Sequence, residues 1–139
     1  MDWKLELVLV PVADVDRAKA FYTHQVGFNL DVDHRAGDSF RVVQMTPPGS
    51  ACSISVGIGI TDAPPGSVRG LHLVVPDIEA ARAQLVERGV AASEIWHMED
   101  GKQTPGPEPS RSDYNSFLNF DDPDGNTWLV QERGRSTGA

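Results

Sequence analysis

The sequence predicts an α+β protein built from two copies of a β-α-β-β-β module. Two observations point to this fold class. A short segment, VADVDRAKA at residues 12–20, returns as VPDIEAARA at residues 75–83, and three strand-like runs follow each copy. An internal repeat of this kind indicates two units with the same secondary structure. We therefore expect a single domain of residues 1–139, with module 1 at about 4–62 and module 2 at about 68–132.

Each copy of the repeat begins a helix. Asp14 and Asp77 stand where a side chain accepts a backbone N–H and caps the first turn. Gly27 and Gly89 come near the expected helix ends. The apolar residues between cap and glycine recur at the spacing of one helical face: Val15, Ala18, Phe21 and Tyr22 in the first copy, and Ile78, Ala81 and Leu85 in the second.

Short runs of strand-forming residues complete each module, separated by Gly, Pro and Asp. The predicted strands of module 1 are Leu5–Val12, Phe28–Asp33, Phe40–Met45 and Cys52–Ile60. Those of module 2 are Leu71–Val75, Ser93–His97, Ser116–Phe120 and Thr127–Gln131.

Three other segments have compositions typical of turns and loops. Residues 122–125, Asp-Pro-Asp-Gly, predict a tight turn that joins the last two strands in a hairpin, because proline presets φ and glycine relaxes the exit. Asp100–Asp113 is rich in proline and lacks an apolar period, so it predicts a surface loop, with a lid over a cleft as the alternative. Residues 133–139 predict a flexible tail.

Composition and charge exclude several classes of partner. The net charge is −8, and no run of Lys or Arg offers the phosphate neutralisation that nucleic-acid binding needs. No apolar run reaches the ~20 residues that span a bilayer, and the first residues lack the pattern of a secretory leader. Since there is also only one cysteine, we expect a cytoplasmic protein. The negative net charge favours a neutral or cationic small molecule as its partner.

The repeat and the closing turn together resemble the vicinal-oxygen-chelate superfamily. The residues that carry the resemblance are Val12, Asp14–Ala18, Phe21 and Tyr22, their copy at 75–83, and residues 122–126. The superfamily includes glyoxalase I, methylmalonyl-CoA epimerase, extradiol dioxygenases, fosfomycin-modifying enzymes and bleomycin-resistance proteins. The resemblance spans about residues 5–132 and implies curved mixed sheets that enclose a cleft, commonly in a homodimer.

The resemblance also implies four positions for the His and Glu ligands of a divalent metal ion. Three of them correspond to Leu7, Gly70 and Leu129, and the fourth falls within residues 39–61, a stretch without Asp, Glu or His. Leucine and glycine side chains supply no donor atom. We therefore predict no metal and no cofactor, with a displaced metal site around His72 as the alternative.

Strand alternation and the resemblance together predict the lining of the cleft. Alternation turns Leu129 and Gln131 to one face of the last strand and Glu132 to the other. The predicted ligand-binding residues are Leu7, Leu9, Gly70, His72, Leu129 and Gln131. His72 is also the candidate catalytic residue, as an acid or base, and the alternative for it is a buried structural histidine. The tryptophans, Trp3, Trp96 and Trp128, are expected in the core or in an interface, with a place at the mouth of the cleft as the alternative for Trp96.

Two classes of function fit these expectations. The first is metal-free binding or sequestration of a small metabolite or antibiotic-like compound. The second is an enzyme of the superfamily that uses His72 or a displaced metal: a glyoxalase-type lyase, an isomerase or epimerase, or a ring-cleaving dioxygenase. A structural module with a filled cleft is a third. The sequence leaves open whether the protein is an enzyme, and whether modules pair within one chain or between chains.

Overall fold

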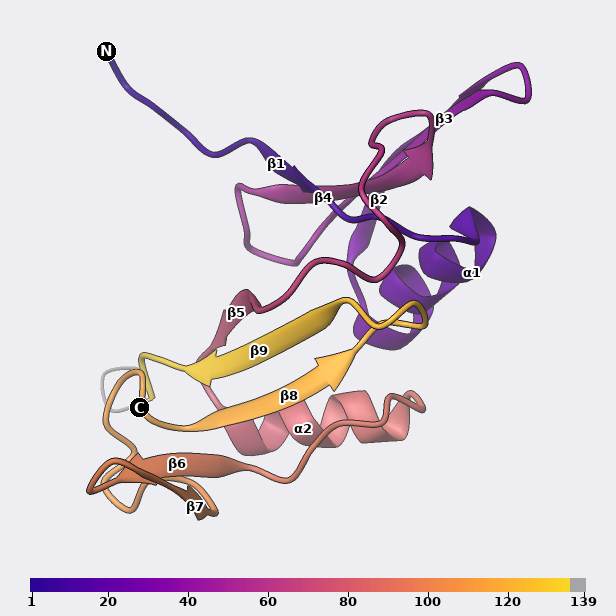
Figure 1. The fold of residues 1–139 in the computed structure, drawn as a ribbon. Helices are drawn as coiled ribbons and strands as arrows, with labels where there is room; N and C mark the ends of the chain where they lie inside the picture. The colour runs from indigo at the N-terminus through magenta and orange to yellow at the C-terminus, as the bar shows by residue number, and fades with distance from the viewer. Residues whose placement is uncertain (136–139) are drawn as a thin grey trace. The chain divides into compact units, whose positions relative to one another are not determined.

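The computed structural model describes residues 1–135 and confirms the predicted fold class. The chain forms two compact units, one of residues 1–68 with 122–126 and one that contains residues 69–121 and continues from residue 127. Each unit holds one mixed sheet and one helical segment (Figure 1). No helix in the described part of the chain has the length and apolar character needed to cross a membrane.

The first unit has a four-stranded sheet in the order β1-β4-β3-β2, in which β1 runs parallel to β4 and the other pairs are antiparallel. The core lies between this sheet and the helix, where Tyr22, Val43, Met45 and Val56 are fully buried. The elements are β1 (Leu7–Leu9), α1 (Val15–Ala20), the π-helical turn η1 (Phe21–Val26), β2 (Asn29–Ala36), β3 (Phe40–Thr46) and β4 (Ser53–Ile58).

The second unit has a five-stranded sheet in the order β5-β9-β8-β6-β7, again with one parallel pair, β5 with β9. Its helix α2 lies against β8 and β9 (Figure 1) and buries Ile78 and Leu85. The elements are β5 (Leu71–Val75), α2 (Ile78–Glu87), β6 (Trp96–Glu99), β7 (Lys102–Pro105), β8 (Phe117–Asp121) and β9 (Thr127–Glu132).

Both predicted helix caps are confirmed. The side chain of Asp14 accepts a hydrogen bond from the backbone N–H of Arg17, and that of Asp77 accepts from Glu79 and Ala80. At the other end of the first helix, Gly27 takes a φ of 92°, which favours glycine because it has no Cβ. The last turns of this helix are wider than predicted, since Phe21–Val26 is π-helical.

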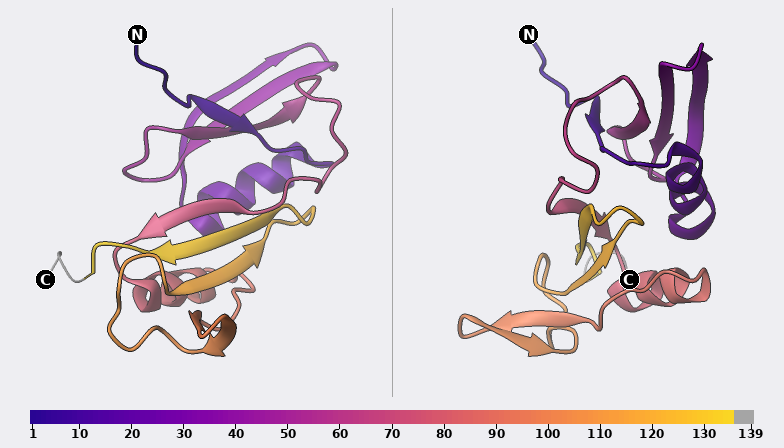
Figure 2. Two further views of the ribbon diagram at one scale, coloured as in Figure 1. Left: turned by 60° about the vertical axis from the view of Figure 1, so that its left-hand side comes forward. Right: turned by 45° about the vertical axis from the view of Figure 1, so that its right-hand side comes forward.

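The prediction of a surface loop over Asp100–Asp113 is wrong for the first part of this segment. Lys102–Pro105 forms strand β7, which pairs with β6 as a hairpin at the edge of the sheet (Figure 2). Asp100 and Gly101 occupy the two-residue turn with φ values of 52° and 75°. Such a turn needs positive φ at both positions, and Asp-Gly is among its preferred sequences. The prolines that follow Asp100-Gly101 favoured the prediction of a loop over that of a hairpin turn.

The first predicted strand, Leu5–Val12, is also shorter than expected. Strand β1 covers only Leu7–Leu9, because its partner β4 begins at Ser53. The N–H of Ser53 donates to the carbonyl of Glu6, and within residues 1–135 no strand pairs with the residues before Glu6.

The predicted Asp-Pro-Asp-Gly turn forms and packs within the first unit. The N–H of Gly125 donates to the carbonyl of Asp122. The buried hydroxyl of Tyr22 donates to Asp122 at 2.7 Å, and the side-chain amide of Asn126 donates to the carbonyl of Pro11 at 2.9 Å. This turn therefore satisfies buried polar groups of the first repeat. Of the predicted tail, residues 133–135 make hydrogen bonds, and residues 136–139 lie outside the described residues.

Candidate functional site

One face of the five-stranded sheet is open, and it carries three of the six predicted ligand-binding residues, His72, Leu129 and Gln131. Strand pairing sets His72 beside Leu129 and Leu129 beside Asn119 in one row. Paired side chains lie on the same face of a sheet. We call this face the open face and define it by the residues that the pairing places on it: His72, Val74, Trp96, Phe117, Asn119, Leu129 and Gln131. All of these residues are exposed or half-buried. The opposite face is buried with α2 and holds Leu118, Phe120, Trp128, Val130 and Glu132.

Two aromatic rings lie flat against each other on the open face. The rings of Trp96 and Phe117 stack with centroids 4.5 Å apart and planes 25° apart. The indole N–H of Trp96 donates to the side-chain carbonyl of Asn119 at 2.8 Å. This hydrogen bond fixes the orientation of an aromatic surface that is only half-buried.

A pocket of about 460 Å³ adjoins this aromatic pair. Trp96 and Asn119 of the open face form one part of its wall. The rest comes from the segment just before β6 (Ser93, Glu94 and Ile95) and from the end of β7 (Gln103, Thr104 and Pro105). A mainly apolar hollow with a few polar groups is the usual form of a site for a small organic molecule. The hairpin that was predicted as a loop thus supplies one wall of the pocket.

Four of the six predicted ligand-binding residues come together at this sheet. Gly70 directly precedes β5, His72 is exposed on β5, and Leu129 and Gln131 are half-buried on β9. The exposure of His72 contradicts the alternative of a buried structural histidine. The side-chain amide of Gln131 donates to the carbonyl of Tyr114 at 3.1 Å, which holds it in place.

The other two predicted residues, Leu7 and Leu9, lie on β1 of the first unit. They stand beside Ser53 and Ser55 of β4 on the sheet face opposite buried Val10. Leu7 is half-buried, and Leu9 is 39% exposed. Of the tryptophans, Trp128 is in the core as expected, whereas Trp3 is exposed.

The residues at the implied metal-ligand positions do not fit a metal ion. Leu7, Gly70 and Leu129 carry no donor atom, and strand β4 within the fourth stretch offers serine hydroxyls but no carboxylate or imidazole. Within residues 1–135, no three His, Cys, Asp or Glu side chains form a group that could hold a cation.

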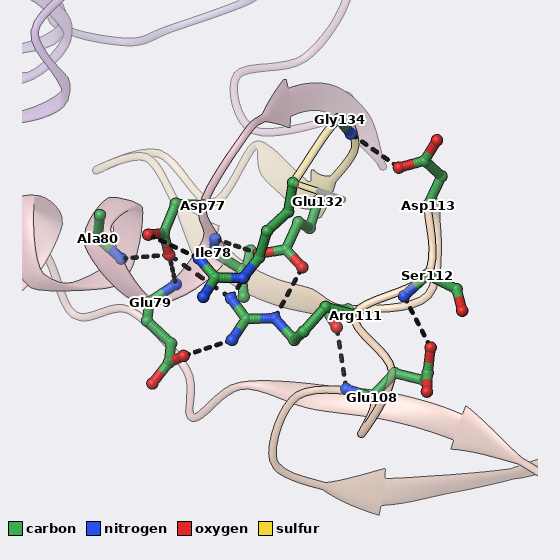
Figure 3. A network of polar contacts seen from close by, with 12 residues as sticks. Asp77, Ile78, Glu79, Ala80, Glu108, Arg111, Ser112, Asp113, Glu132 and Gly134 are labelled. Atoms are coloured by element: carbon green, nitrogen blue, oxygen red, sulfur yellow. Dashed lines mark hydrogen bonds and ion pairs between the residues drawn. The ribbon is translucent and has the colours of Figure 1, made fainter. Parts of the chain in front are cut away.

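Glu132 is the carboxylate nearest in sequence to Leu129, the implied metal-ligand position on β9, and it points away from the open face. It is fully buried and accepts the backbone N–H of Ile78 at 2.8 Å. Arg111 clamps it with Nε–Oε1 and Nη2–Oε2 distances of 2.8 and 2.6 Å, and also donates to Glu79 (Figure 3). Burial alone would raise the pKa of Glu132, but the hydrogen bonds from Arg111 and Ile78 outweigh it and lower that pKa. The predicted orientation of Glu132 is confirmed.

Sequence analysis missed the contribution of Phe117 and Asn119 to the open face, and it named Trp96 only as an alternative at the mouth of the cleft. Alternation within each predicted strand shows which of its residues share a face. It does not show which face of one strand continues which face of another. That depends on the register between β6, β8 and β9, and no turn or spacing in the sequence determines it.

Comparison with known proteins adds an independent line of evidence. The sequence matches the Glyoxalase/Bleomycin resistance protein/Dioxygenase superfamily over residues 4–130. It is 26% identical over 129 residues to the uncharacterized protein YetH of Bacillus subtilis (strain 168), and the alignment covers 90% of this chain and 94% of YetH.

Two solved structures from Streptomyces sp. CB03234 are similar in both fold and sequence. TnmS3, an antibiotic binding protein, superposes with a TM-score of 0.72 at 34% identity, covering 94% of this chain and 96% of TnmS3. A glyoxalase/bleomycin resistance protein superposes with a TM-score of 0.70 at 35% identity, covering 92% of this chain and 99% of that protein.

Proposed function

Because the chain belongs to the Glyoxalase/Bleomycin resistance protein/Dioxygenase superfamily, we propose that it binds and sequesters a small organic molecule on the open face of its five-stranded sheet. The observation that carries the proposal is the stacked pair of Trp96 and Phe117 beside a pocket of about 460 Å³. A half-buried, oriented aromatic surface next to a hollow suits a flat, unsaturated ligand, since rings prefer offset stacking.

The polar groups around the aromatic pair would orient such a ligand. Asn119 holds the indole through its carbonyl oxygen, so its NH₂ group is directed elsewhere and can donate to a ligand. Gln131 stands beside Phe117 and His72 stands beside Leu129, and both add hydrogen-bonding groups to the open face. The net charge of −8 favours a neutral or cationic molecule over an anion.

The similarity to TnmS3 supports sequestration of an antibiotic-like compound in particular. That protein is described as antibiotic binding, and it is 34% identical to this chain over most of both lengths. Binding without a metal agrees with the donor set, because Leu7, Gly70 and Leu129 cannot coordinate a cation. In this proposal, stacking and a few hydrogen bonds provide all the affinity.

Two probes with the same flat ring system test the proposal: acridone, which is neutral, and aminoacridine, which is cationic. We expect both to bind, and the Trp96→Ala variant to lose about tenfold or more in affinity for each, measured by titration calorimetry. Phe40→Ala, which removes an exposed aromatic ring from the first unit, is the matched control and should bind like the wild type. Equal binding by wild type and Trp96→Ala would contradict the proposed site.

A second candidate function is proton transfer by an enzyme of the superfamily. It is favoured by one observation, the exposed imidazole of His72 on the open face. His72→Gln separates the two candidates. If the protein is a binder, this variant should keep acridone affinity within a few-fold of the wild type. If it is an enzyme, the variant should bind normally but lose turnover of a substrate that the wild type converts.

A further inference from the structure

The second unit contains a buried titratable side chain that the proposed function does not use. His97 on β6 is only 4% exposed. It follows Trp96 in the strand, so its side chain points to the face of the sheet opposite the open face. Because buried polar atoms are normally hydrogen-bonded, a partner is expected for each ring nitrogen of this imidazole.

Only one of the two nitrogens has such a partner. Nδ1 lies 2.7 Å from the carbonyl oxygen of Gly106, and since a carbonyl can only accept, Nδ1 carries a hydrogen and donates it. Nε2 is buried, and among residues 1–135 it has no hydrogen-bond partner. A neutral imidazole with its hydrogen on Nδ1 therefore leaves the lone pair of Nε2 buried and unsatisfied.

The carboxylate of Glu99 stands beside this unsatisfied nitrogen. Nε2 of His97 and Oε2 of Glu99 are 3.5 Å apart, and two acceptors cannot bond to each other. A proton on Nε2 changes this contact into a charge-assisted hydrogen bond, with the carboxylate balancing the charge of the imidazolium. The side chain of Glu99 is 63% exposed, so it can move closer without disturbing the core.

Glu99 is the carboxylate that faces His97. The other charged side chains on and around β6 are Glu94 before it, Lys102 on β7, Arg82 on α2, Asp121 on β8, and Glu108, Arg111 and Asp113 between β7 and β8. Within residues 1–135, none of these carboxylates forms an ion pair or a hydrogen bond with His97. Lys102 stands opposite Glu99 in the β6–β7 pairing, as a cation positioned to compete for this carboxylate.

His97 joins two segments that form the wall of the pocket. Trp96 directly precedes His97, Pro105 directly precedes Gly106, and both Trp96 and Pro105 line the pocket. Figure 2 shows the β6–β7 hairpin at the edge of the sheet, where β6 shares a single register pair with β8. Few backbone contacts thus hold this hairpin to the sheet, and the contact of His97 with Gly106 reinforces them.

We propose that His97 is a positioning residue for the ligand, whose protonation fastens the β6–β7 hairpin beside the pocket and strengthens binding. This inference rests on the proposed function, because it concerns the same pocket. Protonated His97 donates to both Gly106 and Glu99, whereas neutral His97 donates to Gly106 alone. A wall that is already fixed loses less conformational freedom when a ligand binds. Histidine side chains commonly change charge between about pH 5 and 8, so binding should strengthen as the pH falls through this range.

Titration calorimetry with acridone at about pH 8 and about pH 5.5 tests the proposal, because the charge of acridone is constant over this range. We expect the wild type to bind about threefold more tightly at the lower pH. His97→Asn, whose amide can still donate to Gly106 but does not titrate, should bind equally at both pH values. Glu99→Gln, at an exposed position, should also lose the change. His34→Gln, at an exposed position of the first unit, is the matched control and should keep it.

Amide hydrogen exchange, followed by NMR, gives a second measurement that needs no ligand. The N–H of Gly106 donates to the carbonyl of Ile95 at 2.8 Å and closes the end of the hairpin. In the wild type, its exchange relative to that of an unfolded chain should be about threefold slower at the lower pH, and in His97→Asn the two values should agree. Absence of acridone binding at both pH values would contradict the proposed function, whereas the exchange of Gly106 would still test the role of His97.

Three results would overturn the proposal. The first is a wild type in which either acridone affinity or the protection of Gly106 is the same at both pH values. The second is a pH change in affinity that His97→Asn and Glu99→Gln both retain. The third is loss of this change in His72→Gln, which would assign it to the exposed imidazole of the open face. Circular dichroism of each variant checks that the fold is retained.

Discussion

Each unit of the molecule holds an arginine that joins its helix to a strand, and the two clusters differ in the exposure of the strand carboxylate. In the first unit Arg41 donates to Asp16 in the first turn of α1, at 2.8 Å, and to Asp33 on β2, at 3.0 and 2.9 Å. In the second unit Arg111 donates to Glu79 in the first turn of α2 and to Glu132 on β9. Asp16 and Glu79 are equivalent positions of the repeat.

The difference lies in the strand carboxylate. The side chain of Asp33 is 24% exposed, whereas that of Glu132 is completely buried. A carboxylate that keeps some water loses little when its ion pair is removed. A fully buried one depends entirely on its protein partners. The same arrangement of charges is therefore expected to matter much more in the second unit.

Removing the buried carboxylate should have the largest effect. Glu132→Leu leaves Arg111 without its main partner and the N–H of Ile78 without an acceptor. We expect a loss of about 3–5 kcal/mol in the free energy of unfolding, measured by urea denaturation. Arg111→Met/Glu132→Leu removes both charges and should lose less than the single variant. A larger loss in the double variant would contradict the burial argument.

The stability of the protein at low pH should also depend on Glu132. The pKa of Glu132 is lowered from the ordinary value of 4.5, since the hydrogen bonds of Arg111 outweigh the opposing effect of burial. Its contribution is thus complete above pH 4.5 and is lost as the pH falls through the lowered pKa. We expect Glu132→Gln to flatten the acid side of the stability profile by up to about 1.4 kcal/mol per pH unit. An unchanged slope below pH 4.5 would mean that folding does not lower the pKa of Glu132.

The corresponding change in the first unit should cost less. Hydrogen bonds from Arg41 and Lys19 lower the pKa of Asp33 strongly, so this group is ionised in the folded protein. In Asp33→Asn, however, Arg41 keeps Asp16 as a partner, and water can reach the neutral side chain. We expect a loss of about 1–2 kcal/mol in urea denaturation. A loss as large as that of Glu132→Leu would show that exposure does not decide the difference.

The helix carboxylates should matter least. The side chains of Asp16 and Glu79 are 81% and 60% exposed, so solvent screens their ion pairs with arginine. We expect Asp16→Asn and Glu79→Gln each to change the free energy of unfolding by about 0.5 kcal/mol, as seen in the urea midpoint. Measuring both at low and high salt sharpens the comparison, because the small effect should shrink further in salt.

Much of the local structure could be predicted because its causes are local. The caps at Asp14 and Asp77 follow from side chains that bond to a backbone N–H two or three residues away. Strand β5 forms at the predicted residues Leu71–Val75. The Asp100-Gly101 turn was predictable in principle, since both residues tolerate positive φ, but the proline-rich sequence after it suggested a loop.

The candidate site was predicted only in part. His72, Leu129 and Gln131 were placed on one face because alternation and the repeat apply within single strands. Trp96 and Asn119 were not, although they line the pocket. Their meeting on the open face depends on which residues of β6, β8 and β9 stand opposite each other, and a shift of one residue would turn them to the buried face.

By itself, the sequence determined the repeat, the helix starts, most strands and the absence of donor atoms at three implied metal positions, because these are properties of residues close together in the chain. Only the tertiary structure decided the strand register, the stacking of Trp96 on Phe117 and the enclosure of Glu132 by Arg111 and α2. These contacts join residues from separate elements, and their energies come from burial and geometry that no short segment contains.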